Sequence, residues 1–284
     1  METIIGLGNA GCNIAEKFLQ YPQYSIYQLD SEKRDASRAK FYHIKEQSSH
    51  EDYEHACPDL RGYFSDIDTS CLLVVGGSGT ISGCVLRVLQ QLSHLKVSVL
   101  YLKPDIELLS QTKKLQNKVV YGVLQEYARS GALEKFYVIQ NSKIVEILGD
   151  LPIIGYYDKI NTLITHTIHM TNIFKNSRSV MNTFSSPMPA ARIASFGVMD
   201  LTTGEEKTFF DLNLPRERVY YYALNRKKLR EDNNLLKTIT EQVTNKTDGG
   251  LVKASYGIYE TDYDEDYVYS VAYTTMIQKE DNSV

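Results

Sequence analysis

The sequence has no long apolar run and little net charge, and these two absences exclude several classes of protein. No segment approaches the roughly eighteen consecutive apolar residues that indicate a membrane-spanning helix. The formal net charge of the 284 residues is -4, so neither nucleic acid nor a membrane surface is expected as the main partner. The amino terminus runs directly into an apolar segment, with no basic stretch before it. We therefore expect a soluble, cytoplasmic protein without a cleaved signal.

Cysteine is also scarce, and its spacing excludes the common zinc and redox motifs. The four cysteines are Cys12, Cys57, Cys71 and Cys84. They form no CxxC pair and have no histidine at zinc-finger spacing, which favours reduced thiols in an intracellular protein. His166 and His169 have nearly the spacing of metal ligands on a helix, but no acid or third ligand lies nearby in the sequence. We expect packed or surface side chains there and no metal site.

The first half of the chain alternates short apolar segments with helical patterns. Strands are predicted over 2–7, 24–30, 70–76, 96–102 and 135–140. Helices are predicted between them, over 12–20, 32–40, 81–94 and 105–130. Alternation of this kind, with strands that are apolar on both faces, predicts a parallel sheet covered by helices on both sides. The fold class is therefore α/β with a Rossmann-like sheet over residues 1–155.

The pattern changes in the second half. Apolar residues at helical intervals predict one long helix from about Tyr156 to Phe174, and we assign 156–175 to a helix that joins the two halves. A loop rich in Ser, Asn and Pro follows. Strands are then predicted over 191–199, 219–224, 253–259 and 267–275, around a polar helix over 227–243. Residues 176–284 are therefore expected to form a smaller α+β domain with a mixed or antiparallel sheet.

Two glycine-rich turns are the most informative feature. Each follows an apolar strand and opens a helix, the first over residues 6–13 (GLGNAGCN) and the second over residues 76–83 (GGSGTISG). Glycine lets a backbone approach a ligand closely, and the amides at the start of a helix direct partial positive charge at an anion. Ligands of parallel sheets bind at the carboxyl ends of the strands, where both turns fall. The pair of turns indicates a nucleotide whose phosphates are held from both sides.

The first turn alone also fits another class of protein. Gly6, Gly8 and Gly11 have the spacing of the dinucleotide-binding fingerprint, and Asp30 follows at the distance of the acid that binds the ribose. An NAD(P)-binding oxidoreductase is therefore an alternative. It does not explain the second glycine turn, and the second half of the chain offers no convincing catalytic pair.

Five segments, in the correct order, resemble the tubulin and FtsZ superfamily of GTP-binding filament proteins. Residues 8–14 are similar to the Gly-Gln-Cys-Gly-Asn-Gln-Ile of tubulin, and 77–83 to the Gly-Gly-Gly-Thr-Gly-Ser/Thr-Gly signature, with Ser78 and Ile81 replacing two glycines. The Gly-Gly-Ser-Gly form is similar to that of phage-encoded tubulins. Three shorter segments also match, over 28–30, 138–141 and 157–164. The resemblance covers about residues 1–200 and implies a GTP-binding domain, a central helix and an activation-type domain.

The resemblance also implies a nucleotide site for GTP or GDP with Mg2+. Tyr157 and Asn161 would stack on the guanine and bind its edge, and Asn13 and Asn141 would supply further purine and ribose contacts. Asp30 would lie near the phosphates or a hydrated magnesium ion, and Asp105 or Glu107 near the ribose. The implied nucleotide-binding residues are Gly8, Asn9, Ala10, Gly11, Cys12, Asn13, Asp30, Gly77, Ser78, Gly79, Thr80, Ile81, Ser82, Asn141, Tyr157 and Asn161.

The catalytic loop of the family is where this sequence departs from the resemblance. Family members insert acids from a loop after the central helix into the next subunit's nucleotide pocket. The corresponding segment here, 179–186, keeps Asn182 but has Phe184 where the acid should be, and no Asp or Glu occurs between Asp158 and Asp200. Loss of a general base costs about a hundred- to ten-thousand-fold in rate. We expect weak or absent GTP hydrolysis, with the catalytic residues unknown.

The family resemblance also bears on partners. It implies head-to-tail filaments of identical subunits, which form when a heterologous contact does not close into a ring. A phage or plasmid protein acting in bacterial cytoplasm is expected, with a DNA-bound adaptor or phage component as a further partner and DNA positioning or segregation as the process. A non-polymerising, nucleotide-binding regulator is the second alternative.

Overall fold

The computed structural model describes residues 2–34, 37–105, 107 and 109–279, and its chain divides into two units. The first unit comprises Met1–Thr165 together with Ile277–Val284, and the second comprises His166–Met276. The boundary falls inside one continuous helix, α6 (Tyr156–Lys175). This helix was predicted from the spacing of its apolar residues, and the prediction is confirmed.

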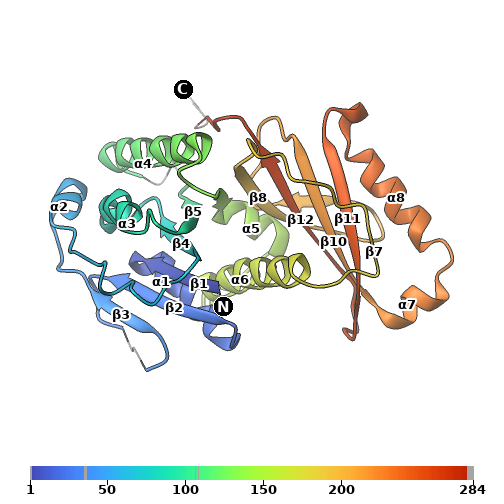
Figure 1. Cartoon of the computed structure of the whole chain (residues 1–284), viewed down its shortest axis with the longest axis horizontal. Helices are drawn as coiled ribbons and strands as arrows, with labels where there is room; N and C mark the ends of the chain where they lie inside the picture. Colours follow the sequence, from blue (N-terminus) through green and yellow to red (C-terminus); the bar gives the residue numbers. More distant parts are fainter. Residues whose placement is uncertain (1, 35–36, 106, 108, 280–284) are drawn as a thin grey trace. The chain divides into compact units, whose positions relative to one another are not determined.

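The first unit is built on a parallel sheet of six described strands (Figure 1). The strands are β1 (Glu2–Leu7), β2 (Tyr24–Asp30), β3 (Lys40–His43), β4 (Ser70–Gly76), β5 (Lys96–Lys103) and β6 (Lys135–Gln140). Their order is β3-β2-β1-β4-β5-β6, and every neighbouring pair is parallel. The chain therefore winds outward in opposite directions from β1 and β4. In sheets of this kind the ligand site lies where the winding direction changes.

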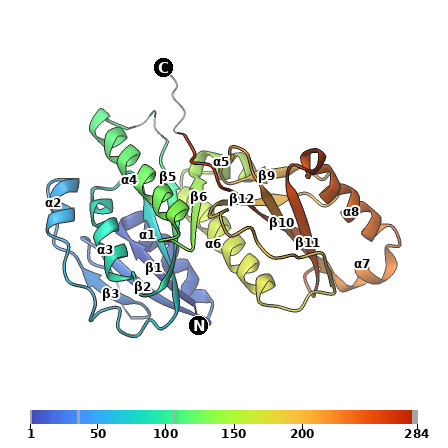
Figure 2. The same ribbon diagram turned by 45° about the horizontal axis from the view of Figure 1, so that its top comes forward.

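Helices lie between these strands, and one more follows β6. They are α1 (Gly8–Lys17) with the 3-10 turn η1 (Phe18–Gln20), α2 (His50–His55), η2 (Thr80–Cys84), α3 (Val85–Gln91), α4 (Gln111–Ser130) and α5 (Asn141–Leu148). Because right-handed crossovers put helices on opposite faces when the winding direction changes, α1 is expected on one face and α3 and α4 on the other. α3 and α4 lie beside each other in both views (Figures 1 and 2).

The helix predicted over 32–40 is wrong. The described residues of this segment contain no helix, and Lys40–His43 instead forms β3 beside β2. The segment has no apolar stripe to bury, and a short helix without such packing is marginal in water. The long helix of the first unit also begins at Gln111 and not at 105, with the Ser110 hydroxyl accepting from the Lys113 amide at its start. Neither β3 nor α5 was predicted.

The second unit has a mixed sheet. Its strands are β7 (Met181–Asn182), β8 (Ile193–Met199), β9 (Glu206–Thr208), β10 (Glu217–Asn225), β11 (Lys253–Thr261) and β12 (Tyr267–Thr274). They are ordered β8-β12-β10-β11-β7, with β9 paired to β8, and only β10 and β11 run parallel. The single helix predicted over 227–243 is two helices, α7 (Arg226–Glu231) and α8 (Leu235–Asn245), and a 3-10 turn, η4 (Asp248–Gly250), precedes β11.

Successive side chains of β10 point to opposite faces of this sheet, and each face is covered by a different helix. Tyr220 and Tyr222 point to one face, where they pack with the apolar side of α8 that contains Ile239. α8 lies along the sheet in Figure 1. Tyr221 points to the other face, where its ring stacks on Phe174 of α6 with centroids 6.5 Å apart. These three tyrosines therefore belong to the core of the second unit.

No helix among the described residues is both long and apolar enough to cross a membrane.

Candidate functional site

The two glycine turns meet in the first unit. They end β1 and β4, which are neighbouring parallel strands, so their turns emerge at the same edge of the sheet. Gly8 has a φ of 70°, and a methyl group added to it would lie 2.5 Å from Cγ2 of Ile81 in the second turn. A methyl group on Gly76 would lie 3.2 Å from Cβ of Ala10. The turns are thus in contact, and glycine is required at Gly8 by both conformation and space.

One further glycine in each turn, Gly11 in the first and Gly77 in the second, lies directly against the structure behind that turn. A methyl group on Gly11 would overlap the carbonyl oxygen of Val74, so glycine is what brings α1 close to β4. A methyl group on Gly77 would overlap the hydroxyl of Tyr101, which donates a buried hydrogen bond of 2.6 Å to Oδ1 of Asn117. The second turn therefore rests on a fixed polar pair.

The polar groups of the turns divide into exposed and internal ones. Asn9, Ser78 and Thr80 are exposed, so their side chains are available to a ligand. Ser82 is buried, and its hydroxyl donates to the carbonyl oxygen of Gly79 at 2.7 Å, which shapes the second turn from inside. Cys12 is also buried, its thiol donates to the carbonyl oxygen of Gly6 at 3.3 Å, and burial raises its pKa to about 12. Its thiol is therefore a structural group in the interior of the first unit.

A cavity of about 450 Å³ lies beside the first turn. The residues that line it are Asn13, Glu16, Lys17, Tyr157, Asp158 and Asn161. The sequence thus identified three of the lining residues, Asn13, Tyr157 and Asn161, and the structure brings them together. It missed Glu16, Lys17 and Asp158, and the side chains of Lys17 and Asp158 form an ion pair of 2.7 Å. Lys17 follows Asn13 by one helical turn, which is the signal that could have placed it on the same face.

Asp30 lies at the carboxyl end of β2 and is already paired. Its side chain is 4% exposed, and its two oxygens accept hydrogen bonds of 2.9 Å from the Ser31 amide and from Nε of Arg34. Sequence reasoning missed Arg34, because it falls in the segment that was predicted to be a helix. The structure turns its side chain back onto Asp30 and the first glycine turn.

Asn141 and Asp105 lie near each other at the ends of neighbouring strands. Asn141 begins α5 directly after β6, and Oδ1 of Asp105 accepts hydrogen bonds of 3.0 Å from Gln140 and from Ser142. Of the two acids proposed for this position, Asp105 is therefore held against the residues that flank Asn141. Glu107 is exposed.

Asn182 belongs to the second unit and lies in a segment that is hydrogen-bonded to the sheet. Met181–Asn182 forms the edge strand β7 on β11, and the Thr183 amide donates to the carbonyl oxygen of Tyr256 at 2.8 Å. A methyl group on Gly257 would lie 2.5 Å from the ring of Phe184, so this ring packs directly on the β11 backbone. The Asn182 side chain is exposed and donates to Ser179 at 2.7 Å.

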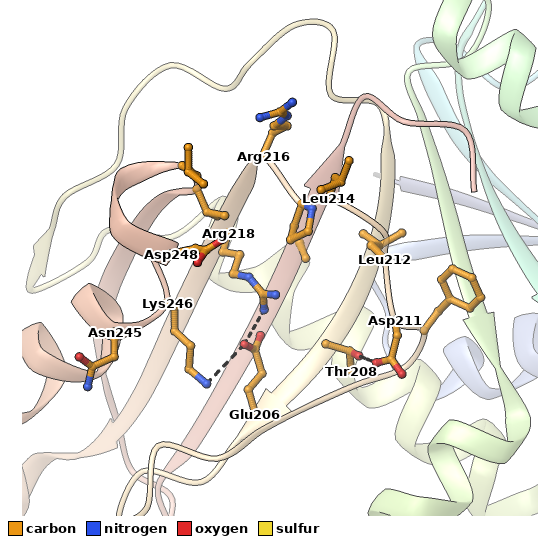
Figure 3. Close-up of a pocket in the computed structure, with 15 residues that line it drawn as sticks. Glu206, Thr208, Asp211, Leu212, Leu214, Arg216, Arg218, Asn245, Lys246 and Asp248 are labelled. Atoms are coloured by element: carbon orange, nitrogen blue, oxygen red, sulfur yellow. Dashed lines mark hydrogen bonds and ion pairs between the residues drawn. The ribbon is translucent and has the colours of Figure 1, made fainter. Parts of the chain in front are cut away.

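The second unit has a larger cavity of its own, of about 570 Å³ (Figure 3). One of its lining residues is Glu206, whose side chain is 4% exposed and accepts hydrogen bonds from Arg218 at 2.6 Å, from Ser270 at 2.7 Å and from Tyr220 at 3.0 Å. Lys246 lies 3.9 Å from the same carboxylate. These contacts leave neither carboxylate oxygen of Glu206 without a hydrogen-bond donor.

His166 lies elsewhere in this unit, with Nε2 3.0 Å from the Tyr269 hydroxyl, as a packed side chain.

This structure, with its two glycine turns at the edge of a parallel sheet, has a tubulin-like fold. It aligns with a GTPγS-form protofilament of TubZ from Bacillus thuringiensis serovar israelensis at a TM-score of 0.71 and 15% identity, over 98% of this chain and 87% of that one. It aligns with an FtsZ dimer from M. jannaschii at a TM-score of 0.65 and 13% identity, over 96% and 88% of the two chains.

A third solved structure, described as a type III plasmid segregation TubZ, gives a TM-score of 0.67 at 15% identity over 98% of this chain and 88% of that one. No protein-family model matches the sequence, and no curated protein sequence matches it. The resemblance read from the motifs is thus confirmed as a shared fold with FtsZ and TubZ.

Proposed function

We propose that the first unit binds GTP or GDP, with the phosphates held between the two glycine turns and the guanine in the cavity beside Asn13. The observation that carries this proposal is the contact between the turns through Gly8 and Ile81, next to a cavity of about 450 Å³. That volume lies in the range of small-molecule sites. In this proposal residues 1–155 are the GTP-binding domain, 156–175 the central helix and 176–284 the activation-type domain.

Each side chain then has a physical role. Tyr157 is 65% exposed and lines the cavity, where a base could stack on its ring, and Asn161 lies one helical turn further on the same face. Amide side chains suit guanine because they both donate and accept.

The family resemblance implies Thr80 and Ser82 as phosphate donors, but the Ser82 hydroxyl already donates to the carbonyl oxygen of Gly79. The exposed Thr80 and Ser78, with the backbone amides of both turns, would therefore face the phosphates. Mg2+ would supply charge neutralisation on the phosphates when bound.

We further propose that the chain assembles head to tail with copies of itself. This is supported by the shared fold with proteins whose structures are described as protofilaments and filaments. A nucleotide enclosed at such a contact stabilises it without being cleaved. A bacterial cytoplasmic location and a DNA-bound or phage-encoded adaptor belong to the same proposal.

Hydrolysis is proposed to be weak or absent. The segment that corresponds to the catalytic loop contains no carboxylate, and it is bound to β11 as an edge strand through Thr183 and Phe184. An Asn side chain at 182 can orient water but cannot accept a proton at neutral pH.

The alternative functions are less well supported. In an NAD(P) site the acid after the second strand binds the ribose hydroxyls, but the Asp30 side chain is only 4% exposed and is paired with Arg34. A non-polymerising regulator would keep the nucleotide site, and assembly assays separate it from a filament protein.

Sedimentation and phosphate release with GTP test the proposal on the wild-type chain and two variants. Asn161→Ala should lose GTP-dependent pelleting, because it removes a base contact. Thr162→Ala is the matched control, since its hydroxyl bonds only to the backbone of its own helix in the described residues. We expect wild type and Thr162→Ala to pellet with GTP and to release phosphate slowly. Pelleting that ignores GTP, or rapid phosphate release, would contradict the proposal.

A further inference from the structure

The side chain of Arg34 connects three parts of the candidate nucleotide site. Its Nε donates to Oδ2 of Asp30 at 2.9 Å, its Nη1 to Oδ1 of Asn13 at 2.8 Å, and its Nη2 to Oδ1 of Asn9 at 2.7 Å. The same Nη2 lies 3.3 Å from the carbonyl oxygen of Asn9. The Arg34 side chain is 13% exposed, and it reaches the cavity only through its hydrogen bond to Asn13, which lines it.

These contacts fix which way two amide groups face. A guanidinium has only donors, so the atom of each asparagine that meets it must be the carbonyl oxygen. The amino groups of Asn13 and Asn9 are therefore turned away from Arg34. Asn13 lines the cavity beside the first turn, and Asn9 is an exposed member of that turn. The amide of Asn13 thus has its oxygen engaged and its amino group left to donate to a ligand.

Asp30 keeps the guanidinium in place. Its carboxylate is 4% exposed, and a buried carboxylate that lost its cation would be left uncompensated at a high cost in free energy. Glu16 contributes weakly at 3.9 Å from a side chain that is 60% exposed. The planar fork of Arg34 directs three separate nitrogens at Asp30 and the two asparagines, whereas Lys would offer all its donors from one nitrogen.

We propose that Arg34 is a positioning residue that holds Asn13 as a hydrogen-bond donor to an acceptor atom of the guanine base. The inference rests on the proposed nucleotide function and assigns base specificity to a residue outside the glycine turns. Without Arg34 the amide can rotate and present its oxygen instead, so the site should discriminate less between a base that has the acceptor and one that lacks it.

Single-atom analogues of GDP test this directly. The three analogues are 6-thio-GDP, 7-deaza-GDP and 3-deaza-GDP, which weaken or remove the acceptors O6, N7 and N3. Their dissociation constants relative to GDP are measured by calorimetry for the wild type, Arg34→Gln, Arg34→Lys and Arg38→Gln. Arg38 is the matched control, because it is a nearby arginine whose Nη2 donates to the Leu19 carbonyl oxygen at 2.8 Å, away from the asparagines.

We expect one analogue to bind the wild type about tenfold more weakly than GDP. In Arg34→Gln the dissociation constant of that analogue should come to within about threefold of the constant for GDP. Arg34→Lys should have the same effect although Asp30 keeps a cation beside it. Arg38→Gln should leave the ratio of the two dissociation constants unchanged. Asn13→Ala should abolish the same discrimination between GDP and the analogue, which a purely structural role of Arg34 would not predict. A ratio retained in both Arg34 variants, or no discrimination by the wild type, would overturn the inference while the nucleotide function stands. A wild type that binds no guanine nucleotide would overturn both.

Discussion

Substitution of Gly8 by alanine gives the sharpest test that the two glycine turns touch. Alanine at a φ of 70° costs about 1–2 kcal/mol, because its methyl group is strained in the left-handed region. The same methyl group would lie 2.5 Å from Cγ2 of Ile81, and overpacking of this kind costs about 1–3 kcal/mol. We therefore expect Gly8→Ala to lower the free energy of unfolding by about 2–5 kcal/mol.

A double-mutant cycle separates the two causes. In an Ile81→Ala background the opposing methyl group is gone, so Gly8→Ala should cost only the conformational part, about 1–2 kcal/mol. Gly122→Ala is the control, since Gly122 lies within α4 with open space around it, and alanine there should stabilise the helix by up to about 1 kcal/mol. Urea denaturation followed by circular dichroism measures the wild type and the four variants.

If Gly8→Ala is as mild as Gly122→Ala, the turn does not have the described conformation. If its cost is the same with and without Ile81, the turns do not touch, and the phosphate site proposed between them has no structural basis.

Two further predictions concern the second unit. His169 is 8% exposed, and its burial, with His166 nearby, lowers its pKa to about 4. As the pH falls from about 6.5 to about 4, the unfolded chain therefore takes up a proton at this histidine before the folded chain does. The free energy of unfolding should decline over that interval by up to roughly 3 kcal/mol. Urea denaturation at several pH values should show a flatter profile for His169→Gln, and an unchanged profile would contradict the assignment. Glu206→Ala should cost about 3–5 kcal/mol, because it leaves the Arg218 cation without its buried partner, whereas Glu241→Ala, on the exposed face of α8, should cost less than about 1 kcal/mol. Equal costs in thermal unfolding would show that the Glu206 network is not a determinant of stability.

Much of the sheet could be predicted from the sequence. The strands before the glycine turns, such as Ser70–Gly76, are runs of buried β-branched and aliphatic residues that end at glycine, and such runs mark buried strands whatever surrounds them. β3 could not be found in this way, because its four residues alternate little and become a strand only by pairing with β2. The break between α7 and α8, over 232–234, was missed because that segment reads as a continuous polar helix.

The residues of the candidate site also differ in whether the sequence alone could identify them. Gly8, Tyr157 and Asn161 belong to local motifs, so the sequence identified them. Arg34 and the Lys17–Asp158 ion pair depend on contacts between segments far apart in the chain, which no local pattern carries.

The central claim is that the first unit binds guanine nucleotides, and thermal unfolding with GTP, GDP, ATP and NAD in parallel, with and without Mg2+, tests it most directly. A ligand at a hundred times its dissociation constant adds about 2.7 kcal/mol to the stability of the chain. We expect GTP and GDP to raise the unfolding temperature and ATP and NAD to leave it unchanged. Stabilisation by NAD alone, or by none of the four, would contradict the account.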